Sequence, residues 1–320
     1  MKVFGGVKST YFAKEICKNL SIDLGLSERK DFSDGEFIPN FEETVRGKNV
    51  YLVQSTFQPL DNLFELLMMA DAAKRSGAKS IIGVVPYKGF ARQDKKDIPR
   101  TPITSSLIAK MIENSGINHL ITMDLHNNSI EGFYNIPVSH LYSSAVVVPY
   151  IRERFFNKNL IIVSPDMGGT KKAKVYSQFL RTDMAICYKY RESANEVKEM
   201  KLIGDVRGKD CLIIDDIADT CGTLVKCASI LKENGANSVI AAIAHPIFSG
   251  RAYERVATSD IEEIIVTNSI PLVGKEVLLQ NRPDSIIGYN KVKVVDVAPL
   301  FASAIRSIEN GTSISANFIV

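Results

Sequence analysis

Short apolar runs alternate with longer segments of helical period along the chain. The run Asn49–Gln54 predicts a strand, the apolar-faced segment Leu60–Ser76 predicts a helix ended by Gly77, and Ser80–Pro86 predicts the next strand. The same alternation predicts a helix at Tyr11–Leu20 and further strands at Lys2–Phe4, Leu120–Met123, Leu160–Val163, Ala185–Cys187 and Leu212–Ile214. Strands that alternate with helices are typical of an α/β fold with parallel sheets.

One stretch of this pattern occurs twice. An Arg-Gly-Lys triplet, a strand, a helix, a Gly-Ala pair, a second strand and a proline extend from Arg46 to Pro86 and again from Arg207 to Pro246. We interpret this repeated pattern as an internal duplication that gives two similar domains, each with a mostly parallel central sheet flanked by helices. A chance likeness of two strand-helix-strand units is the alternative. The expected domains are 1–143 and 144–303, with a tail, 304–320, that packs back on the first.

The composition narrows the possible classes of function. The chain has 320 residues, 45% of them hydrophobic, which is enough to bury two cores. Its 39 basic and 36 acidic residues nearly cancel, so no nucleic-acid partner is expected. The five cysteines include no Cys-x-x-Cys pair, which disfavours disulfides and structural zinc and favours the cytoplasm. No apolar run approaches the roughly 18 residues of a membrane span, so we expect a soluble protein without a membrane partner.

The segment after Leu212–Ile214 has the composition of a phosphate-binding loop. Asp219, Thr220, Gly222 and Thr223 stand between the predicted strand and a helical pattern. Backbone N–H groups at a helix start have no intrahelical partner, and the helix dipole is positive there, so a phosphate is favoured. Glycine allows close backbone approach, and the two hydroxyls can donate to phosphate oxygens. A turn in which Asp219 only caps the helix is the alternative.

Two carboxylates, Asp215 and Asp216, lie between this strand and the loop. They would repel a phosphate, but they suit the vicinal hydroxyls of a sugar or a hydrated Mg²⁺. An acid pair beside a phosphate loop therefore indicates a site for a phosphosugar.

A charged segment after the strand Ser80–Pro86 is a second candidate site. Phe90 with Arg92 could sandwich a flat ring, while Lys95 and Lys96 meet phosphates. A solvated charged loop is the alternative.

Two further strand ends carry polar residues, at the edge where open α/β sheets bind ligands. His126 follows one predicted strand and is either a structural hydrogen-bonding residue or a ligand of metal or phosphate. Asp166, with Gly168 and Gly169 behind it, follows another. The strand end at Asp166 thus repeats the pattern of acid and glycine seen at Asp215–Gly222.

The segment Tyr188–Val197 shows neither a helical nor a strand period. We expect a mobile loop or flap that carries Lys189 and Arg191. A surface hairpin is the alternative.

Specific motifs occur in a fixed order along nearly the whole chain. They are Phe32-Ser33-Asp34-Gly35-Glu36, Ala91 to Lys96, Thr122 to His126, Ser164 to Gly169, Asp215 to Thr223, Val266 to Ile270 and Asn310 to Ser315. This ordered set resembles the ribose-phosphate pyrophosphokinase family, also called the phosphoribosyl pyrophosphate synthetases. The resemblance implies two α/β domains of the phosphoribosyltransferase type. It also implies that the diphosphoryl group of MgATP is transferred to the C1 hydroxyl of ribose 5-phosphate, with AMP as the second product.

The resemblance also assigns roles to individual residues. Those for ribose 5-phosphate are Asp215, Asp216, Asp219, Thr220, Cys221, Gly222 and Thr223. Those for ATP are Arg92, Gln93 and Asp97, with Phe32, Asp34 and Glu36 from a neighbouring subunit. His126 and Asp166 would lie by the phosphates and Mg²⁺, and Lys189, Arg191 and His126 are the expected catalytic residues. No general base is assigned.

The family resemblance further implies a homo-oligomer, commonly a hexamer, with inorganic phosphate as activator and ADP as inhibitor. The matching effector positions are Thr44, Arg46, Arg100, Ser313 and Ser315. The chain departs from the common pattern where Asn127, Asn128 and Ser129 follow His126, where Thr44 replaces a frequent serine, and in a flap with less Arg and Pro. None of these changes removes a charge with an assigned role, so they bear on rate and affinity rather than on reaction type.

Two other functions remain open from the sequence. A phosphoribosyltransferase shares the acid pair and phosphate loop, but the duplication and the segment Arg92-Gln93-Asp94 argue against it. A non-catalytic regulatory homologue would be expected to lose the loop and metal positions, whereas His126, Asp166, Lys189 and Arg191 are present.

Overall fold

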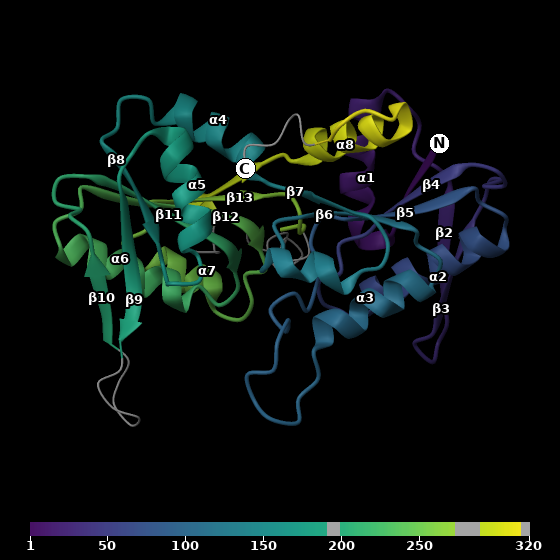
Figure 1. Cartoon of the computed structure of the whole chain (residues 1–320), viewed down its shortest axis with the longest axis horizontal. Helices are drawn as coiled ribbons and strands as arrows, with labels where there is room; N and C mark the ends of the chain where they lie inside the picture. Colours follow the sequence, from purple (N-terminus) through teal and green to yellow (C-terminus); the bar gives the residue numbers. More distant parts are fainter. Residues whose placement is uncertain (191–198, 273–288, 315–320) are drawn as a thin grey trace. The chain divides into compact units, whose positions relative to one another are not determined.

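The fold is described from a computed structural model, which places residues 1–190, 199–272 and 289–314 (Figure 1). Within this part the chain forms two compact units. Unit 1 comprises Met1–Tyr142, Ser269–Pro271 and the described residues from Val297 onward; unit 2 comprises Ser143–Asn268 and the described residues of Leu272–Asp296. The domain boundaries expected from the sequence, 1–143 and 144–303 with a tail at 304–320, remain a prediction.

Unit 1 is built on a parallel sheet of five strands in the order β1-β4-β5-β6-β7. The strands are β1 (Lys2–Gly5), β4 (Asn49–Val53), β5 (Ser80–Val85), β6 (His119–Met123) and β7 (Val138–Leu141). A separate antiparallel hairpin is formed by β2 (Ser27–Asp31) and β3 (Phe37–Phe41). The motif Phe32–Glu36 is thus the tip of a hairpin whose strands the sequence pattern does not reveal.

Helices cover both faces of this sheet. They are α1 (Thr10–Leu20), α2 (Asp61–Arg75), α3 (Thr104–Asn114) and α8 (Ala298–Asn310). Side chains of α2 and α3 form one core with Phe4, Leu52 and Val85 of the sheet. On the other face α1 packs against α8, where the rings of Phe12 and Phe301 meet edge to face at 5.3 Å. Burial on both faces explains why the strands are continuous apolar runs.

Unit 2 contains a sheet of seven strands in the order β10-β9-β8-β11-β12-β13-β14, in which only the edge strand β10 is antiparallel to its neighbour. The strands are β8 (Leu160–Ser164), β9 (Met184–Tyr190), β10 (Glu199–Ile203), β11 (Asp210–Ala218), β12 (Ser238–Pro246), β13 (Glu263–Thr267) and β14 (Val292–Val295). The helices are α4 (Ser144–Arg154), α5 (Thr170–Leu180), α6 (Gly222–Glu233) and α7 (Ala252–Ala257).

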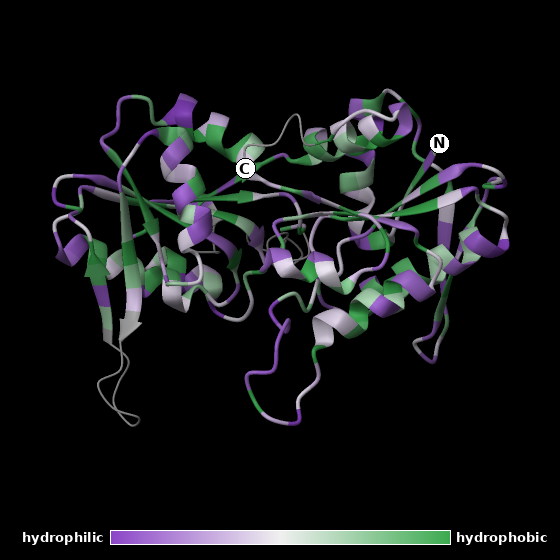
Figure 2. Cartoon of the chain, in the orientation of Figure 1, coloured by the Kyte–Doolittle hydropathy of each residue, from purple (hydrophilic) through white to green (hydrophobic). Residues whose placement is uncertain are grey.

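The residues of β11 alternate between two cores in unit 2. Ile213 faces a core shared with α6 and α7, and its neighbour Ile214 faces a core shared with α4 and α5. The unit therefore has three layers, with helices on both sides of the sheet. Figure 2 shows the strands as largely hydrophobic and the helices as mixed. No helix of the described residues is long and apolar enough to cross a membrane.

The internal duplication appears in matching hydrogen bonds in the two units. In unit 1 the Gly47 N–H donates to the Gly77 carbonyl at 2.8 Å; in unit 2 the Gly208 N–H donates to the Gly235 carbonyl at the same distance. Each bond ties the turn before a central strand to the end of the following helix, α2 or α6. The predicted fold class, two similar α/β units with mostly parallel sheets, is confirmed.

Candidate functional site

The acid pair lies within β11 rather than after it. The strand was expected to end at Ile214, but it continues to Ala218, because β12 is equally long and pairs with it as far as Ala218. Asp215 and Asp216 are both partly buried, and the Asp216 N–H donates to Asp215 Oδ1 at 2.9 Å. The strand backbone therefore fixes both carboxylates close to the start of the loop.

The loop after β11 leads directly into α6, which begins at Gly222. The N-cap residue is Cys221, with φ 60°, and its side chain makes no capping hydrogen bond. The N-cap position therefore belongs to Cys221 and not to Asp219, which lies two residues before it. The backbone N–H groups of the first helical turn, where the helix dipole is positive, suit an anion.

Gly222 itself is not required by the protein's own packing. A Cβ atom built there would lie 3.9 Å from its nearest neighbours, Arg255 Nη1 and Thr220 Oγ1, and its φ is not in the left-handed region. The fold would accept a side chain here. A glycine at this position is therefore better explained by a ligand that approaches the backbone.

A second loop, between β12 and α7, holds the phosphate loop in place. The Ser249 hydroxyl donates to Asp219 Oδ1, and the Ser249 N–H donates to the Asp219 carbonyl at 3.0 Å. Arg255 Nη1 donates to the Thr220 carbonyl at 2.7 Å. Ser249 and Arg255 were not predicted from the sequence, because they lie 30 and 35 residues from their partners and belong to none of the motifs.

Negative charge accumulates at the end of β11. Burial, and then the charge of Asp216, raises the pKa of Asp215 well above its usual range, and Asp166 adds to the shift. Asp166 lies in the loop after β8, where its Oδ1 accepts the Gly169 N–H at 2.9 Å. The structure therefore brings together three predicted acids that favour a cation or sugar hydroxyls nearby.

These acids fit a Mg²⁺ that is bound together with its substrate. Among the described residues, no group of three or more His, Cys, Asp and Glu side chains is arranged to hold a metal ion by itself. Mg²⁺ commonly keeps several waters and uses only one or two carboxylates plus substrate phosphates. Oxygen donors such as Asp166, rather than a closed protein cage, match that chemistry.

In unit 1, two loops at the same edge of the sheet are joined. The Arg92 loop follows β5, and the His126 loop follows the adjacent strand β6. Asn127 Nδ2 donates to Asp94 Oδ2 at 3.0 Å, which connects the two loops. Arg92, Gln93 and His126 are all exposed. Asn127, one of the residues at which the chain departs from the common pattern, thus makes this bridge.

Comparisons with known proteins show which family has this architecture. A family model described as the N-terminal domain of ribose phosphate pyrophosphokinase matches residues 1–116, and one described as the phosphoribosyl synthetase-associated domain matches 190–319. A ribose-phosphate pyrophosphokinase of Porphyromonas gingivalis is 48% identical over 313 residues, covering 98% of this chain and 96% of that protein. The chain belongs to the ribose-phosphate pyrophosphokinase family.

Further members of this kinase family agree with the assignment. A ribose-phosphate pyrophosphokinase of Helicobacter hepaticus is 48% identical over 318 residues, covering 99% of this chain and 98% of that protein. The crystal structure of phosphoribosylpyrophosphate synthetase from Mycobacterium smegmatis has a TM-score of 0.88 and 32% identity, covering 97% of this chain and 99% of that one. The predicted family and enzyme class are confirmed, which disfavours the phosphoribosyltransferase alternative.

The remaining residues predicted for a pyrophosphokinase site lie on separate elements. Phe32 is 44% exposed at the tip of the β2–β3 hairpin, where Asp34 Oδ1 accepts the Glu36 N–H at 3.0 Å. Asp97 is exposed, and its Oδ1 lies 3.6 Å from Lys95 Nζ. The hairpin tip therefore presents an aromatic ring and two acids to its surroundings.

The predicted catalytic flap is described only in part. Its first residues extend β9, since Tyr188, Lys189 and Tyr190 pair with β10 as an antiparallel hairpin. These residues were expected in a mobile loop, but the alternative of a surface hairpin describes them better. Arg191 lies outside the described residues, as does the effector residue Ser315.

The other predicted effector residues lie in unit 1. Thr44 and Arg46 are exposed in the turn before β4, with the Arg46 N–H 3.4 Å from Thr44 Oγ1. Ser313 is exposed beyond α8, and Arg100 lies in the loop between β5 and α3. Asn49 Nδ2 donates to Glu309 Oε1 of α8 at 2.8 Å, so the end of α8 lies beside the start of β4.

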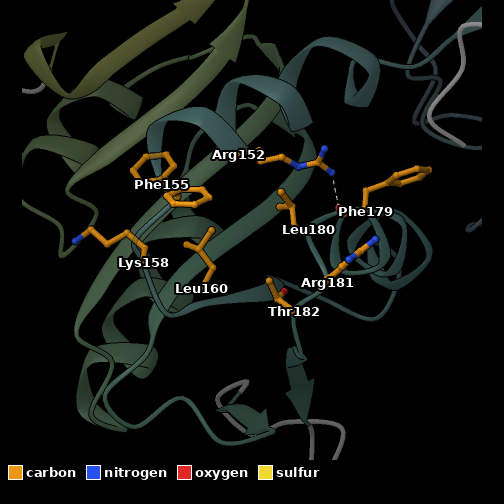
Figure 3. A pocket seen from close by; sticks show the side chains of 9 residues that line it. Arg152, Phe155, Lys158, Leu160, Phe179, Leu180, Arg181 and Thr182 are labelled. Atoms are coloured by element: carbon orange, nitrogen blue, oxygen red, sulfur yellow. Dashed lines mark hydrogen bonds between the residues drawn. The ribbon is translucent and has the colours of Figure 1, made fainter.

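Unit 2 also has a pocket of about 440 Å³ (Figure 3). It lies at the edge of the sheet opposite the edge that carries Asp166 and the phosphate loop. Leu160, the first residue of β8, lines it, whereas Asp166 follows the other end of that strand. Arg152 Nη2 donates a hydrogen bond to the Phe179 carbonyl at 2.7 Å. None of the predicted site residues lines this pocket, so it is not the candidate active site.

Proposed function

We propose that this family member transfers the diphosphoryl group of MgATP to the C1 hydroxyl of ribose 5-phosphate. The products are 5-phosphoribosyl 1-pyrophosphate, for nucleotide biosynthesis, and AMP. The observation that carries the proposal is the start of α6, where Cys221 makes no side-chain cap, directly after the acid pair of β11. This arrangement matches a phosphate joined to a hydroxylated sugar.

Ribose 5-phosphate is assigned to this segment of unit 2. The first-turn N–H groups of α6 and the hydroxyls of Thr220 and Thr223 donate to the 5-phosphate. Asp215 and Asp216 accept hydrogen bonds from the ribose hydroxyls. Ser249 and Arg255 do not bind substrate in this scheme, because they hold the loop from behind.

ATP is assigned to the loops of unit 1. Arg92, Gln93 and Asp97 contact the nucleotide, and Phe32, Asp34 and Glu36 of a neighbouring subunit complete the adenine pocket. The exposure of Phe32 supports this arrangement, because a base that stacks on the exposed ring would bury its apolar surface.

Charge neutralisation during the transfer is assigned to Lys189 and Arg191 as cations, and to His126 through the Mg²⁺ that its neutral imidazole would hold. Displacement at the β-phosphorus spreads negative charge over its oxygens, and positioned cations stabilise that charge. Asp166 and His126 are the proposed protein ligands of Mg²⁺. When bound with ATP, Mg²⁺ neutralises phosphate oxygens and holds them in position. Lys189 and Arg191 beside the reacting phosphate would also exclude water from it.

Regulation and assembly follow the family pattern in this proposal. The protein forms a homo-oligomer, a hexamer, activated by inorganic phosphate and inhibited by ADP. Thr44, Arg46, Arg100, Ser313 and Ser315 would form the effector site. The cytoplasm is its proposed location, since all five cysteines are buried and none forms a disulfide.

The reaction is tested by incubating the purified protein with MgATP and ribose 5-phosphate and measuring AMP. AMP should appear only when both substrates are present. ADP with free phosphate, or no product, would refute diphosphoryl transfer. The absence of any product would favour the non-catalytic alternative.

The ribose 5-phosphate assignment has its own test. Thr223→Ala should raise the KM for ribose 5-phosphate and leave the KM for ATP nearly unchanged, because only one substrate loses a donor. Equal losses for both substrates would contradict the assignment.

A further inference from the structure

His140, near the end of β7, uses both of its ring nitrogens. Its side chain is 3% exposed, and its ring packs against that of Tyr142 with 4.5 Å between centroids. Nε2 accepts the Leu125 N–H at 3.0 Å, and Nδ1 lies 2.6 Å from Glu131 Oε1. His140 therefore connects Glu131, in the 3-10 helix Asn128–Phe133, to the residue immediately before His126.

The hydrogen-bond partners determine the form of this ring. A backbone N–H can only donate, so Nε2 must accept and carries no proton. The proton then resides on Nδ1 and is donated to the Glu131 carboxylate. Glu131 thereby holds the ring in the tautomer and orientation that accept the Leu125 N–H.

The turn that ends β6 needs such support. Asp124 has φ 44°, in the left-handed region that a residue with a side chain seldom adopts. Its N–H donates to the Leu141 carbonyl of β7 at 3.0 Å, and the next N–H, of Leu125, donates to His140. Two successive backbone donors of the turn are thus held by β7.

The residue after His126 is held as well. Asn127 Nδ2 donates to Asp94 Oδ2, and Asn127 Oδ1 accepts the Ser129 N–H at 3.0 Å. His126 is therefore the exposed residue between two restrained neighbours. Its backbone position depends on Leu125 on one side and on Asn127 on the other.

We propose that His140, oriented by Glu131, is a positioning residue that fixes His126 for the diphosphoryl transfer. The inference rests on the role proposed above for His126. Neither His140 nor Glu131 touches substrate in this scheme; they act through the Leu125 backbone. Residues of this kind, which orient a ligating or catalytic side chain, typically contribute about 10- to 100-fold in activity.

Glu131 is the better residue to vary, because its side chain is 39% exposed and its removal leaves no buried cavity. Glu131→Ala should lower kcat about 10- to 100-fold while the KM for ribose 5-phosphate, whose proposed residues lie in unit 2, changes less than twofold. Glu131→Gln should restore most of kcat, because the amide oxygen still accepts the Nδ1 proton. Equal losses in both variants, or no loss in either, would overturn the proposal.

His119→Ala is a matched control for His140→Ala. His119 lies on β6, the strand adjacent to β7, and its Nε2 bonds the Ser139 hydroxyl at 2.8 Å. It stands at the opposite end of β6 from His126. His140→Ala should lower kcat about 10- to 100-fold, and His119→Ala by less than threefold, with both melting temperatures recorded. A loss of kcat that follows melting temperature alike in both variants would show a merely structural role.

A double-mutant cycle decides whether the effect passes through His126. In the His126→Ala background, adding Glu131→Ala should change kcat less than twofold, because there is no longer a side chain to position. A full additional loss in that background would overturn the inference. If His126→Ala alone leaves kcat unchanged, the proposed role of His126 fails first, and the positioning role fails with it.

Discussion

Gly222→Ala separates a requirement of the fold from a requirement of the ligand. The substitution adds one methyl group at the first residue of α6, where the nearest atoms of the protein, on Arg255 and Thr220, would be 3.9 Å from the new Cβ. The free protein therefore meets no steric conflict. A phosphate bound at the first-turn N–H groups would meet the methyl group.

The two effects should have opposite signs. Replacing a helical glycine with alanine at a compatible position stabilises a protein by about 0.4–1 kcal/mol, chiefly by restricting the unfolded chain. That corresponds to a rise of roughly 1–4 °C in melting temperature for a unit of this size. Loss of one charge-assisted hydrogen bond to the phosphate costs about 1.5–3 kcal/mol, or roughly 10- to 100-fold in the KM for ribose 5-phosphate.

The assay is thermal unfolding of the free protein together with steady-state kinetics in which each substrate is varied in turn. The KM for ATP should change less than twofold. Gly132→Ala is the matched control, because a Cβ there meets no atom within 4 Å and the residue lies in no predicted site. It should leave both KM values unchanged.

Two outcomes would refute the reasoning. An unchanged KM for ribose 5-phosphate in Gly222→Ala would show that the phosphate does not lie against this backbone. A fall of several degrees in melting temperature would show that the glycine is needed by the fold itself.

Four further variants test other parts of the structure. Gly89→Ala should lower the melting temperature by several degrees in thermal unfolding, because its Cβ would lie 2.3 Å from the Thr56 carbonyl oxygen; unchanged stability would refute this backbone contact. Burial lowers the pKa of Lys88 from 10.5 to about 8, a penalty of about 3 kcal/mol at pH 7. Between those pH values the folded state binds fewer protons than the unfolded state, so the penalty falls as the pH rises. Lys88→Met removes the buried charge and should therefore raise the melting temperature most at pH 7 and less at pH 10. A gain that does not depend on pH would contradict this. Lys189→Ala and Arg191→Ala should each lower kcat about 100-fold or more with little change in the KM for ribose 5-phosphate, whereas a change mainly in KM would exclude a transition-state role.

The sequence by itself determined the fold class and the duplication, and it predicted the chemistry of the loop around Gly222. Strand and helix periods are local, so they predicted β4, α2 and β5 to within one or two residues. The Asp, Thr and Gly residues around Gly222 are informative because their donors, acceptors and backbone freedom belong to the residues themselves. The order of the motifs then indicated the family.

Only the tertiary structure showed which residues hold the loops of the candidate site in place. The extension of β11 through Asp215 and Asp216 depends on pairing with β12, so an apolar run could not reveal it. The bonds from Ser249 to Asp219 and from the Leu125 N–H to His140 join residues that are far apart in the sequence. A serine or histidine leaves no local pattern that names its partner, because only the folded sheet brings the two together.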